Sequence, residues 1–139
     1  MKTLYETKGI ATGGRGGNVR TEDGKFTAKL ALPTGLGGKG DGNNPEQLFA
    51  CGYAACFGGA LMVAARNQKL TLKDSDVEIT ADVKLVQNDQ GGFELQVALT
   101  GNLAGVDKTT SQTLMEAAHQ ICPYSKATRG NIDVTLHVK

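Results

Sequence analysis

The sequence predicts an α+β fold in which one long buried helix packs against antiparallel-rich sheets. Residues 44–67 form a single helical pattern that is apolar or small on nearly every side. Residues 77–99 contain two segments in which apolar and polar side chains alternate, which is typical of strands. Residues 107–120 show a second helical pattern, and residues from 132 onward alternate again. These segments add a helix and a strand to the predicted α+β fold.

The first third of the chain is expected to form strands. These are residues 4–11, 18–21 and 26–32. Asp23-Gly24 is a hairpin signal between the second and third strands. A glycine-rich turn around Arg15 separates the first two, and a second glycine-rich loop covers residues 34–43. Gly35–Gly40 fits the G-x-G-x-x-G pattern, but no βαβ unit surrounds it, so we expect no dinucleotide there.

The long helix has a well-marked start. Asn44 is a good cap, Pro45 suits the first helical position, and Glu46 favours the first turn through the helix dipole. The helix is expected to end near Asn67, about 34 Å further on at 1.5 Å per residue. Because it is apolar or small all round, it calls for burial on every side. One chain of this size has little sheet for that, so we expect a partner subunit to cover the remaining face.

The second half should contain a hairpin, a helix, a helix break and a last strand. The first strand places Val77, Ile79, Ala81, Val83 and Leu85 on one face, and its partner aligns Phe93, Leu95, Val97 and Leu99. The helix over 107–120 should bury Leu114, Ala117, Ala118 and Ile121. Cys122-Pro123 interrupts it, a short helical turn follows, and Ile132, Val134, Leu136 and Val138 alternate in the final strand.

Composition narrows the function. At 139 residues we expect one domain over residues 1–139. A net charge of +1, 5% aromatic residues and no tryptophan argue against nucleic acid. Residues 47–65 carry no charge, yet glycines and alanines make them a weak membrane span. Three cysteines without a secretory signal favour a reducing compartment, so we expect a cytoplasmic protein.

The three cysteines have different surroundings. Cys51 and Cys56 lie five residues apart on one helix, about 140° around its axis, so they face different sides. Cys122 lies at the proline break, where a thiol has room to move. His119 shares a helix face with Cys122, which would suit half of a metal site, but a solvent-facing or packed histidine is the more ordinary interpretation and no metal is expected.

Asn44–Phe49 together with Gly52–Phe57 closely resembles the signature of organic hydroperoxide resistance (Ohr) proteins, within the Ohr/OsmC superfamily. Thr12–Arg15 and Cys122–Ser125 fall where that family carries its arginine and its second cysteine. The resemblance covers essentially the whole chain in order and spacing. Cys51 departs from the alanine usual in the family.

The resemblance implies a thiol-dependent peroxidase of OsmC-like fold. Cys56 would be the peroxidatic cysteine, Cys122 the resolving cysteine, and Arg15 with Glu46 the supporting ion pair. The substrate would be an alkyl or lipid hydroperoxide, favoured by apolar residues such as Phe57 and by the loop that carries Leu36. A lipoyl-type dithiol would be the reductant, with no cofactor or metal.

An always-charged arginine would oppose the effect of burial on the thiol, because a buried cysteine resists ionisation. Glu46 is about 15 Å from Cys56 along the helix, so its role would be to hold Arg15. If the long helices of two subunits cross antiparallel, one Glu46 end approaches the middle of the other helix. We therefore expect an intertwined homodimer with a shared site.

Three other functions are compatible with the sequence. The first is a peroxidase of the OsmC branch of the superfamily. The second is a cysteine hydrolase or acyltransferase that uses Cys56, although no histidine is evidently paired with it. The third is a non-catalytic module that senses redox state or binds a ligand through the same thiols.

Overall fold

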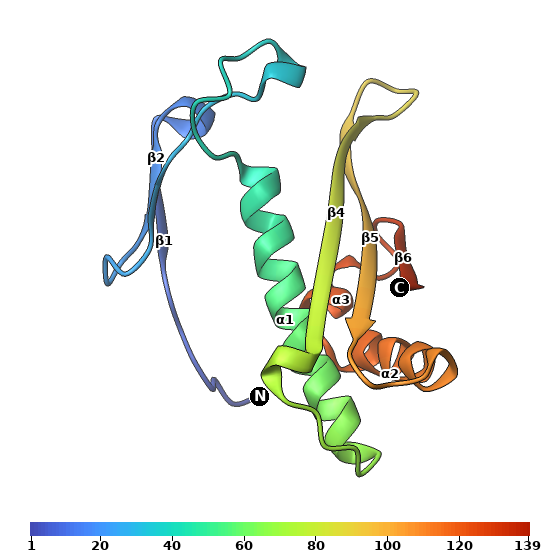
Figure 1. The fold of residues 1–139 in the computed structure, drawn as a ribbon. Helices are drawn as coiled ribbons and strands as arrows, with labels where there is room; N and C mark the ends of the chain where they lie inside the picture. Colours follow the sequence, from blue (N-terminus) through green and yellow to red (C-terminus); the bar gives the residue numbers. More distant parts are fainter. The chain divides into compact units, whose positions relative to one another are not determined.

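The longest element is helix α1 (Pro45–Asn67), which begins and ends where the sequence predicts (Figure 1). The computed structural model describes residues 1–139. Asn44 Oδ1 accepts a hydrogen bond from the Gln47 backbone N–H at 2.9 Å. Gln47 Oε1 in turn accepts from the Asn44 N–H at 3.2 Å. This reciprocal cap satisfies donors that the first helical turn leaves unpaired.

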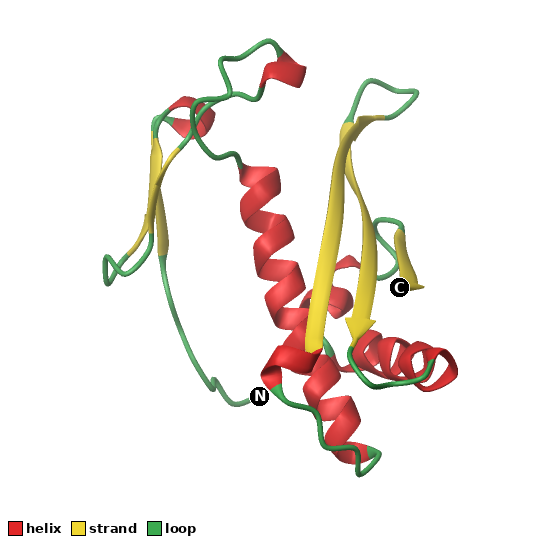
Figure 2. Ribbon diagram, viewed as in Figure 1, coloured by secondary structure: helices red, strands yellow, loops and turns green.

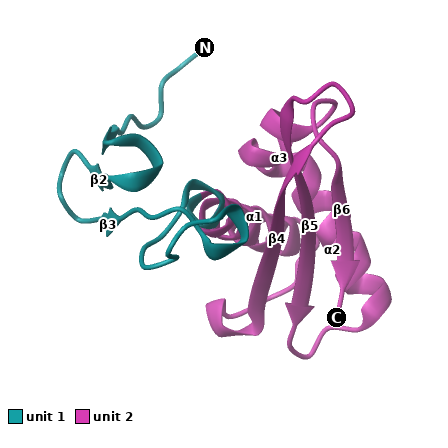
Figure 3. Cartoon of the chain, turned by 90° about the horizontal axis from the view of Figure 1, so that it is seen from above, with its two compact units in different colours: residues 1–48 teal, residues 49–139 magenta.

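The chain divides into two compact units, residues 1–48 and 49–139 (Figure 3). The first unit holds a three-stranded antiparallel sheet in the order β1-β2-β3. Its strands are β1 (Gly9–Thr12), β2 (Asn18–Thr21) and β3 (Thr27–Lys29). The first unit is therefore a small antiparallel sheet followed by the start of α1.

Two of these strands are shorter than the sequence predicts. β1 begins at Gly9 because its partner β2 ends at Thr21, opposite Gly9. Beyond the Lys8 carbonyl, which accepts from the Glu22 N–H at 3.0 Å, the chain before Gly9 has no strand to pair with, and Leu4 is 88% exposed. β3 ends at Lys29, after which Leu30 bridges to Asn43 instead of continuing along β2. Strand length here is set by the partner rather than by the alternation of the strand's own residues.

The second unit holds a long hairpin, two helices and a final strand. The strands are β4 (Val77–Gln87), β5 (Phe93–Leu103) and β6 (Val134–Val138), and the helices are α2 (Lys108–Ile121) and α3 (Pro123–Thr128). β4 and β5 pair antiparallel, and β6 pairs with β5 in parallel. The parallel pairing is allowed because α2 and α3 supply the long crossover that it requires (Figure 2).

The helices lie on one face of the β4-β5-β6 sheet and form the core of this unit (Figure 3). The fully buried larger side chains come from α1, β5, α2 and the α2–α3 junction. They are Tyr53, Phe57, Leu61, Leu99, Leu114, Met115 and Cys122. Ile121 was expected to be buried but is 39% exposed. Cys122 takes the core position instead, because the chain leaves the helix immediately after Ile121.

Helix α1 presents two different sides. Tyr53, Phe57 and Leu61 are completely buried, whereas Cys51, Ala55 and Gly59 on the other side are exposed. By length and composition α1 could cross a membrane, with a mean hydropathy of 1.8. Helices in the cores of soluble domains meet the same description, and the buried side of α1 forms such a core. The single chain covers one side of its longest apolar helix and leaves a strip of small residues uncovered.

Candidate functional site

Arg15 lies in the turn that joins β1 to β2, within a short 3-10 segment, Gly14–Gly16. Gly13 has a φ of 78°, which side-chain-bearing residues rarely adopt. At Gly17 a Cβ atom would lie 1.7 Å from the Thr12 carbonyl oxygen, so only glycine fits. The glycines around Arg15 therefore shape a tight turn that carries one arginine at its tip.

Arg15 and Glu46 form a bidentate ion pair. Arg15 Nη1 donates to Glu46 Oε2 at 2.9 Å, and Nη2 donates to Oε1 at 2.6 Å. Asn43 makes backbone hydrogen bonds to Lys29 and Ala31, which brings the start of α1 back beside β3. The hydrogen bonds from Arg15 are the main cause that holds the pKa of Glu46 below its ordinary value. The carboxylate thus stays ionised and fixes the guanidinium in one orientation.

Cys56 on α1 and Cys122 at the α2–α3 junction lie together in the second unit. Their Sγ atoms are 3.5 Å apart, and the Cys122 thiol donates to Cys56. All three cysteines are free thiols; Cys122 is buried, Cys56 is partly exposed and Cys51 is exposed. A disulfide requires sulfurs about 2.05 Å apart, so a small shift would join Cys56 to Cys122. Cys51 faces the uncovered side of α1.

The surroundings of Cys56 oppose its ionisation. Burial is the main cause that raises its pKa, and the hydrogen bond and charge of Cys122 raise it further. The backbone amide of Tyr124 acts in the other direction and lowers this pKa. None of these groups is a cation. Thiolate chemistry at Cys56 therefore needs a positive charge from another group.

Four side chains near this pair are joined by hydrogen bonds, and only one of them, His119, was singled out as a candidate from the sequence. The Ser125 hydroxyl lies 2.8 Å from His119 Nδ1 and 3.0 Å from the Tyr53 hydroxyl. The Tyr53 hydroxyl is also 3.0 Å from Thr128 Oγ1. Only the i, i+3 spacing of Ser125 and Thr128 signals a shared face in the sequence. We call these four residues the hydroxyl network.

Neither histidine pairs with a cysteine. His119 bonds to Ser125, and burial, with a smaller effect of Arg129, lowers its pKa. His137 Nε2 lies 3.1 Å from Thr135 Oγ1. His119 is thus a packed histidine, one of the two interpretations that the sequence favoured. The cysteine hydrolase alternative lacks the thiol–histidine contact that would support it.

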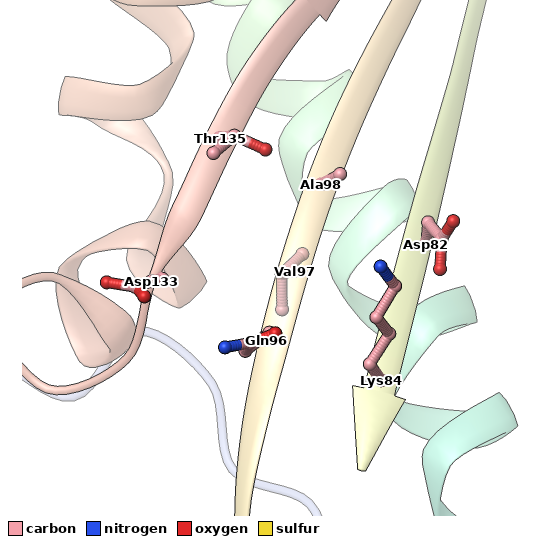
Figure 4. Close-up of a pocket in the computed structure, with 7 residues that line it drawn as sticks. All are labelled: Asp82, Lys84, Gln96, Val97, Ala98, Asp133 and Thr135. Carbon is pink, nitrogen blue, oxygen red and sulfur yellow. The ribbon is translucent and has the colours of Figure 1, made fainter. Parts of the chain in front are cut away.

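The second unit has several hollows, among them the following two, and no cysteine lines either of these. One, of about 410 Å³, is lined mainly by apolar side chains, among them Phe49, Phe93, Leu95 and Ile132. The other, of about 270 Å³, lies on the sheet and is lined by polar groups such as Asp82, Lys84 and Asp133 (Figure 4). Phe57, expected to favour an apolar substrate, is fully buried in the core and lines neither. Nearer the thiols, the ring of Tyr124 packs against the rings of Phe49 and Tyr53.

Comparison with known proteins gives consistent matches along the chain. The family described as OsmC-like protein matches residues 38–137. The organic hydroperoxide resistance protein of Xanthomonas axonopodis pv. citri is 52% identical over 136 residues, which cover 97% of this chain and 94% of that protein. OhrB of Bacillus subtilis is 44% identical over 137 residues, 98% of each chain.

Solved structures agree in fold as well as in sequence. The structure of Bacillus subtilis OhrB matches with a TM-score of 0.88 and 44% identity, covering 99% of this chain and 100% of that one. An organic hydroperoxide resistance protein from Legionella pneumophila matches with a TM-score of 0.92 and 47% identity, covering 99% of each chain. The chain therefore belongs to the OsmC-like family and, within it, to the organic hydroperoxide resistance proteins.

Proposed function

We propose that the protein reduces organic hydroperoxides with Cys56 as the nucleophile and Cys122 as the resolving cysteine. The observation that carries the proposal is the 3.5 Å separation of the two Sγ atoms, one partly exposed and the other buried behind it. The Cys56 thiolate attacks one peroxide oxygen and the O–O bond breaks. The alkoxide leaves and takes up a proton to become the alcohol, while Cys56 becomes a sulfenic acid.

Cys122 then attacks the Cys56 sulfur. The S–O bond breaks, the hydroxyl leaves as water with the Cys122 proton, and a Cys56–Cys122 disulfide forms. An external dithiol restores both thiols by disulfide exchange and is itself oxidised to a disulfide. Overall, one hydroperoxide and one dithiol give one alcohol, one water and one oxidised dithiol. No metal or organic cofactor enters this sequence.

Arg15 is proposed to supply the positive charge that Cys56 needs. Its guanidinium is always charged and its fork of donors suits both a thiolate and the developing charge on a leaving alkoxide. Glu46 holds that fork through two hydrogen bonds. In this role Glu46 acts through Arg15, because a carboxylate beside the thiolate would oppose its ionisation.

We infer a homodimer from the uncovered side of α1. Cys51, Ala55 and Gly59 form an exposed strip of small residues on a helix whose other side is core. Small residues allow two helices to approach closely, so a second copy of the chain is the occupant we favour. An intertwined pair with antiparallel α1 helices would let the two chains share each site.

The substrate and reductant follow from similarity and surroundings. Relatives are named for resistance to organic hydroperoxides, and the ring of Tyr124, two residues after Cys122 and 42% exposed, packs against Phe49 and suits an alkyl or lipid hydroperoxide. A lipoyl-type dithiol is the proposed reductant, and the cytoplasm the proposed location. An OsmC-branch peroxidase is less favoured, because the relatives above are organic hydroperoxide resistance proteins.

The test is consumption of cumene hydroperoxide by the purified protein with dihydrolipoamide, in parallel with hydrogen peroxide and with a monothiol in place of the dithiol. We expect turnover with the dithiol and a preference for cumene hydroperoxide. A thiol that reacts once and does not turn over with any dithiol would instead indicate the redox-sensing or ligand-binding module.

A further inference from the structure

The hydroxyl network ties three helices together beside the two thiols. Tyr53 belongs to α1, His119 to α2, and Ser125 and Thr128 to α3. Tyr53 and Ser125 are completely buried and Thr128 is 6% exposed. Thr128 Oγ1 also donates to the Ser125 carbonyl at 3.1 Å. Each buried hydroxyl therefore has a protein partner, as a network that fixes geometry requires.

The network holds the short segment that carries Cys122. Cys122 ends α2 through its N–H to the Ala118 carbonyl at 2.8 Å, and its carbonyl begins α3 by accepting from Lys126 at 3.0 Å. Ser125 follows three residues later, so its hydroxyl anchors the first turn of α3. The same turn carries the Tyr124 amide, which acts on the Cys56 thiol. One anchored turn therefore presents both a thiol and an amide to Cys56.

Helix α1 carries both Tyr53, which bonds to Ser125, and Cys56, which contacts Cys122. Tyr53 and Cys56 are three residues apart on the helix and so lie on neighbouring turns. Tyr53 reaches Ser125, while Cys56 meets Cys122 at 3.5 Å. The Tyr53–Ser125 hydrogen bond and the Cys56–Cys122 contact thus lie about one turn apart along α1.

We propose that Ser125, held by Tyr53 and His119, is a positioning residue that keeps the Cys122 thiol and the Tyr124 amide against the Cys56 sulfur. The proposal extends the thiol mechanism above and rests on it. Removal of the Ser125 hydroxyl breaks the hydrogen bonds that tie the first turn of α3 to α1 and α2, and leaves Tyr53–Thr128 as the network's one remaining link between α1 and α3. The two sulfurs then meet less often, and the amide stabilises the Cys56 thiolate less.

Ser125→Ala is the direct test, and Ser111→Ala is its matched control. Ser111 is another buried serine of the same unit, on α2, outside the network. Tyr53→Phe is the second variant: it keeps the ring packing and the Ser125–His119 bond but removes the hydroxyl that joins α1 to α3. If Ser125→Ala does not fold, Tyr53→Phe decides the question.

The readouts avoid hydroperoxide, so that the positioning role can fail independently of the peroxidase. We measure alkylation of Cys56 by iodoacetamide against pH, and closure of the Cys56–Cys122 disulfide by diamide, which takes up the two electrons and two protons. We expect Ser125→Ala to slow closure by about three- to tenfold and to raise the alkylation midpoint by about half a pH unit or more, the effect of losing one hydrogen bond. Tyr53→Phe should act in the same direction.

Ser111→Ala should leave both readouts at wild-type values. Loss of thermal stability in Ser125→Ala and Tyr53→Phe, with alkylation and closure equal to those of Ser111→Ala, would overturn the proposal and leave the network a purely structural feature. Absence of hydroperoxide turnover in the wild-type protein would instead refute the proposed function, and the two thiol readouts would still decide the role of Ser125.

Discussion

At Cys56 burial and chemistry oppose each other. Burial raises the pKa of this thiol, yet only a thiolate cleaves a peroxide bond. The Tyr124 amide offsets part of that effect, and the proposed function assigns the rest to Arg15, which Glu46 holds by two hydrogen bonds. The motif residues Cys56, Cys122, Arg15 and Glu46 could be picked out from the sequence as candidates. The Tyr53–Ser125 contact could not, because its partners are 72 residues apart and only the tertiary structure joins them.

Replacement of Cys56, the proposed nucleophile, should separate its role from that of Cys51 on the same helix. Cys56→Ser should abolish hydroperoxide turnover, whereas Cys51→Ser should retain most of it, because Cys51 faces the exposed side of α1. Steady-state turnover with a dithiol measures both. Activity that survives in Cys56→Ser but disappears in Cys51→Ser would show that Cys51, and not Cys56, is the nucleophile.

Removal of the Arg15 guanidinium tests its proposed effect on the pKa of Cys56. Arg15→Ala should raise the Cys56 pKa by about one unit or more and slow the peroxide step, because the thiolate loses its counter-charge. Glu46→Gln should act in the same direction but more weakly, through loss of the bidentate pair. Thiolate absorbance against pH reports the pKa, and Arg20→Ala, an exposed arginine on β2, is the control. An unchanged pKa and rate in Arg15→Ala would remove Arg15 from the mechanism.

Among the elements, the break between α2 and α3 matters most for the proposed chemistry, because it carries Cys122. Pro123 predicted it, because proline suits a first helical position and no helix interior, and the structure has α3 beginning there. Strand ends were harder to predict. β1 and β3 are shorter than the alternation of their residues suggests, because a strand extends only as far as the neighbouring strand pairs with it. Ile121, the last residue of α2, is exposed, and the next residue, Cys122, occupies the core position at this end of the helix.

Replacement of Cys122, at the break between α2 and α3, tests whether this thiol resolves the Cys56 sulfenic acid. Cys122→Ser should still make the first attack on hydroperoxide, because Cys56 and the Arg15–Glu46 pair are unchanged. The Cys56 sulfenic acid should then persist or oxidise further to the sulfinic acid, since no protein thiol resolves it. Mass spectrometry after one and after ten equivalents of hydroperoxide distinguishes these states. Normal multiple turnover in Cys122→Ser would show that this thiol does not resolve the intermediate.

For the whole molecule, the two sides of α1 connect fold to assembly. An all-apolar helix was predicted from the sequence together with the need for a partner to cover it, and the single chain indeed leaves Cys51, Ala55 and Gly59 exposed. A site shared between two chains stays a prediction, because no local sequence pattern encodes contacts between subunits. The proposed homodimer is the assembly in which such a site would form.

A charge introduced by mutation on the uncovered side of α1 tests the proposed homodimer. Ala55→Lys should convert a dimer to a monomer in sedimentation velocity, because an ammonium group would be buried between two helices without a partner. Ala104→Lys, at an exposed alanine after β5, should leave the oligomeric state unchanged. A wild-type protein that sediments as a monomer, or a fully dimeric Ala55→Lys, would contradict this assignment of the interface.

Cys56 and Cys122 of one chain are proposed to form a redox pair, and disulfide mapping tests this pairing most directly. The reduced protein is treated with one equivalent of organic hydroperoxide, and its disulfides are mapped by peptide mass spectrometry without reduction. The 3.5 Å contact between the two sulfurs predicts a single Cys56–Cys122 disulfide within one chain, with Cys51 still free. A disulfide that joins two chains, or one that joins Cys51 to Cys122, would contradict the account even if hydroperoxide were consumed.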